Sequence, residues 1–152
     1  MMAQWLQTPA VRDWWGDPAT ELALVSEDLD NVLMDQRIAS FDGVPFGYVQ
    51  SYPCAAWGAP HFHNQPDDAR AMDTCIGVPA LLGKGHGAAM VRLYAKRLLA
   101  EGAAAVVIDP DPTNLRAIHA YRRAGFRDIA VRPGEAGDAV LVMRFDPAFL
   151  CS

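Results

Sequence analysis

Three glycines alternate in residues 82–88, which read Leu-Gly-Lys-Gly-His-Gly-Ala. Residues 71–78, before them, form an apolar, strand-like run with one acid, and residues 90–98, after them, place apolar side chains at helical spacing. Alternating glycines at the start of a helix let a ligand approach the backbone and leave amide N–H groups directed outward, where the helix dipole favours an anion. The segment therefore predicts a phosphate or pyrophosphate site near Gly85, with a plain tight turn as the alternative.

The spacing of the glycines distinguishes between the familiar phosphate loops. A dinucleotide fingerprint requires Gly-x-Gly-x-x-Gly after the first strand of a βαβ unit, whereas Gly83, Gly85 and Gly87 alternate strictly. A Walker A loop requires Gly-Lys followed by Ser or Thr, whereas Lys84 is followed by Gly85. Neither motif describes this chain.

Two segments carry a resemblance to a known superfamily. Residues 82–88 resemble the acyl-CoA loop of the GCN5-related N-acetyltransferases (the GNAT superfamily), Arg/Gln-x-x-Gly-x-Gly/Ala, with Leu82 where Gln or Arg is commoner. Residues 108–126 resemble its second CoA segment, Asn-x-x-Ala-x-x-x-Tyr-x-x-x-Gly-Phe, and every element is present between Asn114 and Phe126. The second segment also suits a helix, because Thr113 or Asn114 can cap its start and a glycine can end it.

Within the superfamily, the chain most resembles bacterial aminoglycoside 6′-N-acetyltransferases. The matching segments are Val11–Gly16, Gly47–Tyr52, Met72–Asp73, Leu82–Gly87 and Asp109–Phe126. Siderophore-pathway acetyltransferases share much of this frame. The resemblance implies a mixed α/β (α+β) fold of the GNAT type, with a mostly antiparallel central sheet flanked by helices and splayed at strand 71–77. The family opens with a strand before its first helix, whereas this sequence begins inside that helix. Either the true start lies upstream, or the protein lacks the strand. In the second case a sheet edge is exposed, which could pair with a second chain in a homodimer.

Local patterns predict the order of the elements. The expected order is a helix at 1–7 with an exit turn at 14–18, a helical stripe at 20–35, a hairpin of 38–41 and 44–52 around Asp42-Gly43, a loop at 53–70, strand 71–77, helix 86–101, strand 103–108, helix 113–124 and strands 126–131 and 139–145.

Composition excludes several classes of protein. The chain has 152 residues, of which 51% are hydrophobic, as expected for a single soluble domain spanning residues 1–152. It shows no apolar run of the roughly 18 residues that a membrane helix needs and no secretory signal. Its three cysteines are too few and too scattered for a disulfide framework, which favours the cytoplasm. A net charge of −5 without blocks of like charge argues against nucleic acid and suits a cationic small-molecule amine.

Two residues are expected to carry the chemistry of acetyl transfer. Asp73 lies mid-strand among apolar residues, where an unpaired carboxylate is costly. The resemblance implies that it orients the acceptor amine and accepts its proton, directly or through water; the alternative is a structural salt bridge to an arginine. Tyr121 is the expected proton donor to the departing thiolate, and the alternative is an aromatic residue of the core.

The other expected contacts divide between acetyl-CoA and the acceptor. The predicted acetyl-CoA contacts are Cys75, Ile76, Val78, Gly83, Lys84, Gly85, His86, Gly87, Ala88, Asn114 and Ala117. The predicted acceptor contacts are Trp14, Trp57, Asp73, Asp109 and Asp111. Asn114 could instead serve only as a helix cap, and Asp109 and Asp111 as turn residues; strand backbone N–H groups near Ile76 could stabilise the oxyanion.

Two further features suggest other chemistry. His61-x-His63 lies near Cys54, but one such pair without a second ligand cluster does not predict a metal site, and no metal is expected. Cys75 could be mistaken for an acyl nucleophile, but its strand position favours a small core residue.

We therefore expect an enzyme that transfers acetyl from acetyl-CoA to an aminoglycoside amine, at the 6′ position. A siderophore hydroxylamine or a polyamine is the alternative acceptor. A domain that binds CoA without turnover is the alternative of another class.

Overall fold

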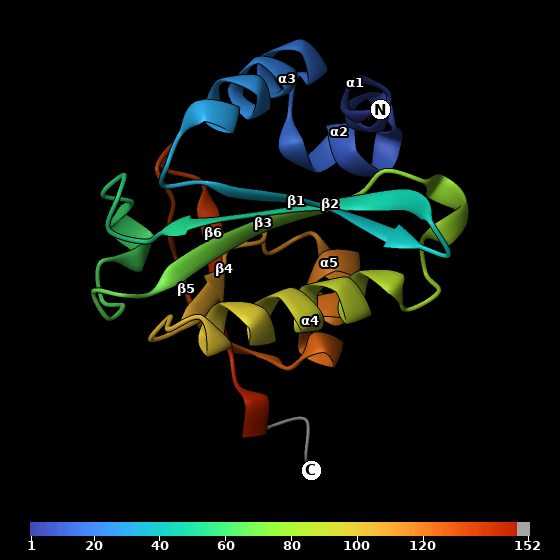
Figure 1. Ribbon diagram of the computed structural model, residues 1–152. Coiled ribbons are helices and arrows are strands. Elements are labelled where there is room, and N and C mark those ends of the chain that lie inside the picture. Colours follow the sequence, from blue (N-terminus) through green and yellow to red (C-terminus); the bar gives the residue numbers. More distant parts are fainter. Residues whose placement is uncertain (149–152) are drawn as a thin grey trace.

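A six-stranded sheet lies between two groups of helices in the computed structural model, which describes residues 1–148 (Figure 1). The strands are β1 (Asp35–Phe41), β2 (Val44–Pro53), β3 (Arg70–Ile76), β4 (Val106–Ile108), β5 (Phe126–Pro133) and β6 (Ala139–Phe145). The helices are α1 (Met2–Gln7), α2 (Pro9–Trp15), α3 (Pro18–Glu27), α4 (His86–Ala100) and α5 (Leu115–Ala124), and short 3-10 turns η1, η2 and η3 span Asp28–Asp30, Pro60–Phe62 and Pro79–Leu81. Helices α1–α3 cover one face of the sheet and α4 and α5 the other. This arrangement confirms the expected mixed α/β fold.

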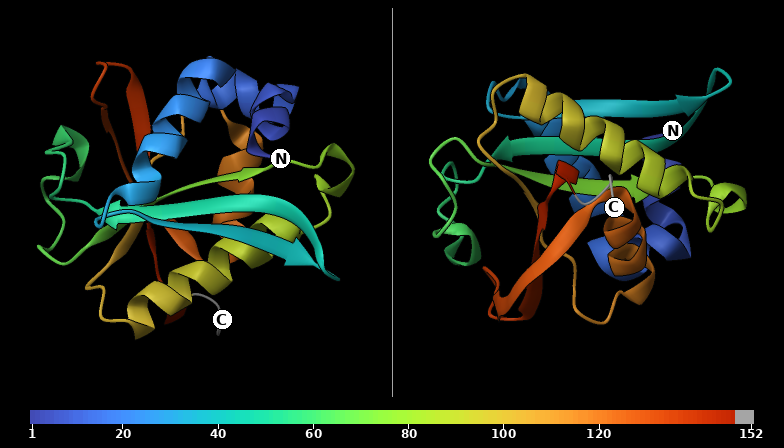
Figure 2. Two further views of the ribbon diagram at one scale, coloured as in Figure 1. Left: turned by 45° about the horizontal axis from the view of Figure 1, so that its top comes forward. Right: turned by 90° about the horizontal axis from the view of Figure 1, so that it is seen from below.

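The sheet opens between its third and fourth strands. Its order is β1-β2-β3-β4-β6-β5, and every neighbouring pair is antiparallel except β3 and β4. That parallel pair is joined only where Arg70 faces Val106 and Ala71 faces Val107. Beyond this point the strands diverge, and β5 and β6 swing away from β1–β3 (Figure 2). The splay leaves the second half of β3 without a strand on that side, as the resemblance implied.

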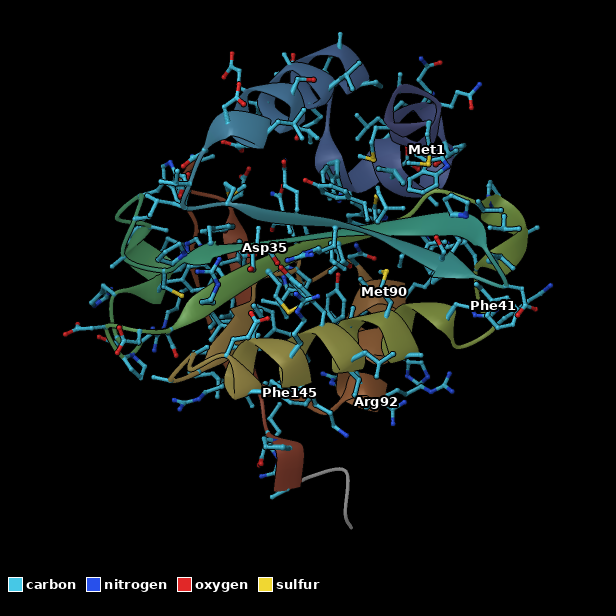
Figure 3. The ribbon with its side chains drawn as sticks, viewed as in Figure 1. Met1, Asp35, Phe41, Met90, Arg92 and Phe145 are labelled. Atoms are coloured by element: carbon cyan, nitrogen blue, oxygen red, sulfur yellow. The ribbon has the colours of Figure 1, made fainter. Side chains whose placement is uncertain are left out.

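Alternation along the strands sorts side chains between the two helix layers. Met72 of β3 faces α4 and α5 in the largest core cluster, whereas Cys75 faces α1–α3. Helix α4 directs Met90 toward the sheet and Arg92 away from it (Figure 3). A Cβ at Gly47 would lie 2.7 Å from Met90 Sδ and 3.2 Å from the carbonyl oxygen of Cys75, so α4 packs closely on β2 at this glycine.

Several local predictions are confirmed. Asp42 and Gly43 have φ of 50° and 77° in the turn between β1 and β2, as a tight hairpin requires. Helix α5 begins after Asn114, whose side chain accepts a hydrogen bond from Ala117 N, and ends at Gly125 with φ of 111°. The six C-terminal elements occur in the predicted order, although β4 begins at Val106 rather than at residue 103.

Other local predictions are wrong. The exit turn expected at residues 14–18 is only partly present. Trp14 and Trp15 end α2, which begins with Pro9 at its first turn, and Gly16 and Asp17 connect α2 to α3. The helical stripe expected at 20–35 ends at Glu27 and η1, because its later members lack a partner: Val32 is 98% exposed. Residues 35–37 instead pair with β2 and belong to β1.

The expectation of an exposed edge agrees with the sheet order. Among the described residues, β1 is the first strand of the chain, and it lies at one edge of the sheet. No helix within residues 1–148 is both long enough and apolar enough to cross a membrane. Cys151 lies outside the described residues.

Candidate functional site

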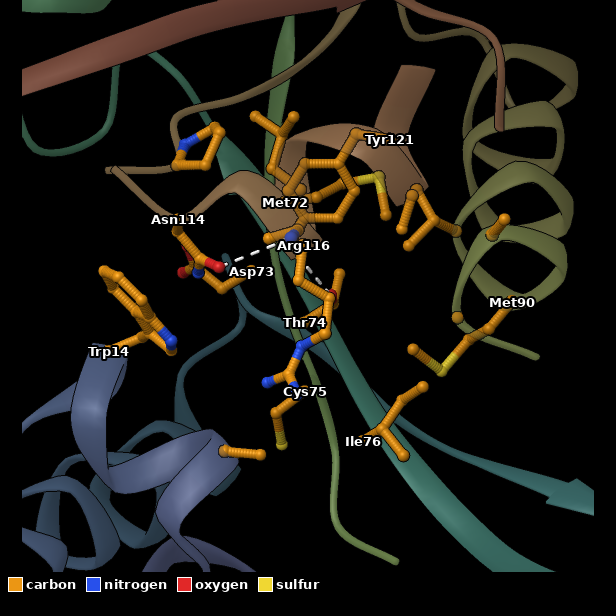
Figure 4. Close-up of a pocket in the computed structure, with 18 of the residues that line it drawn as sticks. Trp14, Met72, Asp73, Thr74, Cys75, Ile76, Met90, Asn114, Arg116 and Tyr121 are labelled. Carbon is orange, nitrogen blue, oxygen red and sulfur yellow. Dashed lines mark hydrogen bonds between the residues drawn. The ribbon is translucent and has the colours of Figure 1, made fainter. Parts of the chain in front are cut away.

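A cavity of about 450 Å³ lies beside the splayed half of β3 (Figure 4). Its walls come from α2, β3, the glycine segment before α4, the segment after β4, and α5. The predicted site residues that line it are Trp14, Asp73, Cys75, Ile76, Gly83, Gly85, Gly87, Ala88, Asp109, Asp111, Asn114, Ala117 and Tyr121. The fold therefore brings residues from distant parts of the chain to one cavity.

The glycine segment forms one end of the cavity. Gly83 and Gly85 have φ of 72° and 85°, in the left-handed region that favours glycine. Gly85 is the N-cap of α4 and no side chain caps this terminus, so backbone N–H groups of the first turn lack helical acceptors. At Gly87, a Cβ would lie 3.0 Å from Ile76 Cδ1. This geometry fits a pyrophosphate held by backbone N–H groups.

Basic side chains from α5 line the same cavity, and one of them lies at its glycine end. Arg116, His119 and Arg123 line the cavity, because spacings of three and four residues place them on one face of the helix. An ideal Cβ on Gly85 would lie 3.8 Å from Arg123 Nη2, so this guanidinium lies against the glycine segment. The end of the cavity that holds Gly85 is therefore cationic, which suits phosphate groups.

Asp73 lies half-buried on β3, directly opposite Gln50 of β2. The Gln50 amide donates to Asp73 Oδ2 at 2.8 Å, and the Tyr48 hydroxyl donates to Gln50 Oε1 at 2.7 Å. Burial and the nearby negative charge of Asp109 raise the pKa of Asp73 to about 7, against the opposing effect of the Gln50 hydrogen bond. A base with a pKa near the working pH is suited to accept a proton from an amine.

The environment of Asp73 bears on its two predicted roles, an acceptor-binding base and a partner in a salt bridge. None of the arginines in residues 1–148 forms an ion pair with it. Glu21 also lines the cavity, and its charge adds to the rise in the pKa of Asp73. A carboxylate held among other acids and facing a cavity lacks its cation, which a bound ammonium group would supply.

Tyr121 projects from α5 toward the opposite face of β3. Its hydroxyl lies 3.3 Å from Thr74 Oγ1, and either oxygen can donate. Burial raises the pKa of Tyr121 to about 12, so the phenol keeps its proton at neutral pH. Tyr121 also packs against Phe126, with ring centroids 6.2 Å apart, so it is both a core aromatic and a residue of the cavity.

Further acids and two tryptophans also line the cavity. Asp111 accepts hydrogen bonds from the backbone and hydroxyl of Thr113, which lower the pKa of its carboxyl. It therefore forms the predicted turn and also lines the cavity. Trp14 lies beside the cavity, and Trp15 Nε1 donates to the carbonyl of Thr74 at 3.3 Å, which ties α2 to β3.

Four predicted contacts lie away from the cavity lining. Trp57 packs edge-to-face on Tyr52, with centroids 5.1 Å apart, and Lys84 is exposed. The His86 ring packs against two phenylalanines of the hairpin. Val78 packs against the core clusters.

The Cys75 thiol is buried and its pKa is raised to about 12, as expected for a core residue rather than a nucleophile.

Several lining residues were not predicted from the sequence. Among the polar ones these are Glu21, Gln50, Thr74, Arg116, His119 and Arg123. Trp15, for which the sequence left a sugar wall and core packing open, also lines the cavity. For α5, the shared helix face with Asn114 and Tyr121 could have indicated the basic residues. Nothing in the spacing of Glu21 connects it to β3. In the described part of the chain, no three His, Cys, Asp or Glu side chains gather in a way that could hold a metal ion.

Comparison with known proteins bears on this geometry. Residues 1–132 match the family model described as an acetyltransferase (GNAT) domain. This chain belongs to the GNAT acetyltransferase family. It is therefore an acyltransferase, and the cavity beside β3 is the candidate active site of a GNAT enzyme.

Individual relatives of this GNAT chain are aminoglycoside acetyltransferases. Aminoglycoside N(6′)-acetyltransferase type 1 of Klebsiella pneumoniae is 32% identical, over 98% of this chain and 79% of that protein. The solved structure of AAC(6′)-Ib in complex with ribostamycin and coenzyme A superposes with a TM-score of 0.85 at 29% identity, covering 98% of this chain and 88% of that one. A complex of AAC(6′)-Ib with paromomycin and acetyl-CoA gives a TM-score of 0.81 at 28% identity, with the same coverage.

Proposed function

We propose that this protein transfers the acetyl group of acetyl-CoA to an amine of an aminoglycoside, at the 6′ position. The observation that carries the proposal is the separation of charge within one cavity. Backbone N–H groups and Arg123 lie together at the glycine segment, whereas Asp73 lies close enough to Asp109 and Glu21 for their charges to raise its pKa. Asp111 also lines the cavity. A polyanionic donor and a polycationic acceptor can therefore bind together, and their reacting groups would meet beside β3.

The residues of the cavity suit each proton movement of the reaction. The amine nitrogen attacks the thioester carbonyl carbon, a C–N bond forms and the C–S bond breaks. Asp73 accepts the proton that the amine loses, directly or through water, and Tyr121 supplies a proton to the leaving sulfur. Backbone N–H groups on the open side of β3 would stabilise the oxyanion.

The expected cofactor contacts follow from the same arrangement. The donor's pyrophosphate would lie on the backbone N–H groups of residues 83–88, and its pantetheine arm would run along β3 like an added strand. Asn114, besides capping α5, lines the cavity where it could hydrogen-bond the donor. The solved relatives bound to acetyl-CoA or coenzyme A support this assignment.

An acetylation assay with kanamycin-type compounds that carry or lack the 6′-amine tests the regiochemistry. We expect acetylation only of the compounds that carry the 6′-amine, and equal activity on both kinds would refute the assignment. Spermidine and a hydroxylamine of the siderophore type belong in the same panel, because either would replace the aminoglycoside if it were the preferred acceptor. Release of the CoA thiol distinguishes an enzyme from a CoA-binding module, which releases none.

We further propose that the chain acts as a single catalytic domain in the cytoplasm and that β1 pairs in a homodimer. Ile38 and Phe41 of this edge strand are 41% and 51% exposed. An added strand would cover both residues and the unpaired edge. Light scattering after size exclusion should give twice the mass of the chain, and a monomer at high concentration would contradict the pairing.

A further inference from the structure

His61 is buried beside the acceptor part of the cavity, although nothing in the proposed chemistry uses it. It lies in η2 and is 4% exposed. Its Nε2 lies 2.8 Å from Asp109 Oδ2, and Asp109 lines the cavity. The first residue of the His-x-His pair is therefore a partner of a predicted acceptor residue.

The fold holds this histidine in place from several sides. Phe62, the next residue, is 2% exposed and packs in a cluster with Ala71 of β3 and Val107 of β4. Arg132 of β5 donates from Nη1 to the His61 carbonyl at 3.4 Å. Segment 53–70, which lacks periodicity, is thus anchored against the sheet directly beside Asp109.

Hydrogen-bond satisfaction selects one form of the imidazole. His61 Nδ1 is buried and has no hydrogen-bond partner among residues 1–148. A hydrogen on Nδ1 would be a buried donor without an acceptor, which is costly. The tautomer with its hydrogen on Nε2 donates that hydrogen to Asp109 Oδ2.

We propose that His61 is a positioning residue for the acceptor, acting through Asp109. It fixes one carboxylate oxygen of Asp109, so that the other is presented to an ammonium group of the bound acceptor. The proposal rests on the proposed acetyl transfer to a polycationic amine.

The kinetic test compares two substitutions of His61. Gln can place an N–H near the position of Nε2, whereas Leu fills the site without a donor. We expect His61→Leu to raise the acceptor KM by roughly tenfold, the scale of a hydrogen bond to a charged group, with the acetyl-CoA KM unchanged. His61→Gln should recover most of the loss, and His63→Leu, in the same segment but exposed, should have no effect.

A double-mutant cycle separates positioning from a purely structural role. In an Asp109→Asn background, His61→Leu should add less than about a twofold further change, because the route through Asp109 is already broken. An equal penalty in both backgrounds, or a failure of His61→Gln to recover the acceptor KM, would overturn the proposal.

A spectroscopic measurement tests the pair without relying on activity or on the fold of a Leu variant. Long-range ¹H–¹⁵N spectra of the unsubstituted protein should show His61 as the Nε2–H tautomer, with signals that shift in Asp109→Asn. An Nδ1–H tautomer, or signals indifferent to Asp109→Asn, would contradict the pairing. If the unsubstituted protein acetylates none of the amines, the proposed function fails, while the spectra still decide whether His61 holds Asp109.

Discussion

The two ends of the cavity are built from different kinds of groups. The donor end uses backbone N–H groups of one contiguous segment, residues 83–88, reinforced by Arg123. The acceptor part uses carboxylates from α3, β3 and the segment after β4. Two of them are held by partners from other elements: Gln50 donates to Asp73, and His61 bonds Asp109. The donor end is thus fixed by local backbone geometry, whereas the acceptor part depends on tertiary packing and can differ between relatives with the same donor site.

The largest effect should follow from removing the charge at the acceptor part. Asp73→Asn keeps the shape of the side chain and a hydrogen-bond partner for Gln50 but removes the proton acceptor. We expect kcat/KM for the amine to fall by about 10²–10⁴-fold, with the acetyl-CoA KM nearly unchanged, in steady-state thiol release. Loss of acetyl-CoA binding with activity retained would identify Asp73 as a structural carboxylate. The two ends of the cavity could then not be assigned to different ligands.

The next largest effect is expected at Tyr121, which lines the cavity beside β3. Tyr121→Phe removes a proton donor and leaves the ring packing, so kcat should fall by about 10²-fold, because water can partly replace the phenol. Tyr94→Phe is the matched control, since it removes a buried hydroxyl that bonds Ser51 and Asp35 and does not line the cavity. Full activity of Tyr121→Phe would exclude Tyr121 as the proton donor and identify it as a core aromatic alone.

A smaller effect is expected from the donor end. Gly85→Ala adds a methyl group between the backbone and Arg123 at a positive φ. We expect the acetyl-CoA KM to rise by about tenfold, with backbone strain contributing ~1 kcal/mol to a loss of stability. Gly58→Ala is the control, because its φ of 63° carries similar strain in open space away from the cavity. An equal change in KM for Gly58→Ala would show that strain alone causes the effect.

The smallest effect is on stability, and it depends on pH. The pKa of Asp73 is raised to about 7 in the fold, above that of an unfolded aspartate. The folded state therefore binds the proton more tightly, and the free energy of unfolding falls as pH rises from about 4 to 7. Asp73→Asn has no charge to bury, so this penalty is absent. Its free energy of unfolding should exceed that of the unsubstituted protein by on the order of 1–2 kcal/mol at pH 8, and by little near pH 4. Urea unfolding over this range measures the difference, and a constant difference would contradict the raised pKa.

The sequence is most informative where a function is local in the chain. The glycines at 83–87 and the segment Asn114–Phe126 predict the donor site, because a turn, a cap and a helix face depend on neighbouring residues. Asp73 was found because an acid is conspicuous within an apolar strand. Gln50 and Glu21 were not assigned to the site, because their positions depend on strand register and on packing against β3. The role of His61 was also missed, since its partner lies 48 residues away.

Titration calorimetry on two variants tests the separation of the two ends most directly. Arg123→Gln should weaken coenzyme A binding severalfold and leave the binding of a 6′-amino aminoglycoside unchanged. Asp73→Asn should weaken the binding of the aminoglycoside and leave the binding of coenzyme A unchanged. If each variant weakened both ligands equally, or if the two effects were exchanged, the assignment of the ends of the cavity would be wrong.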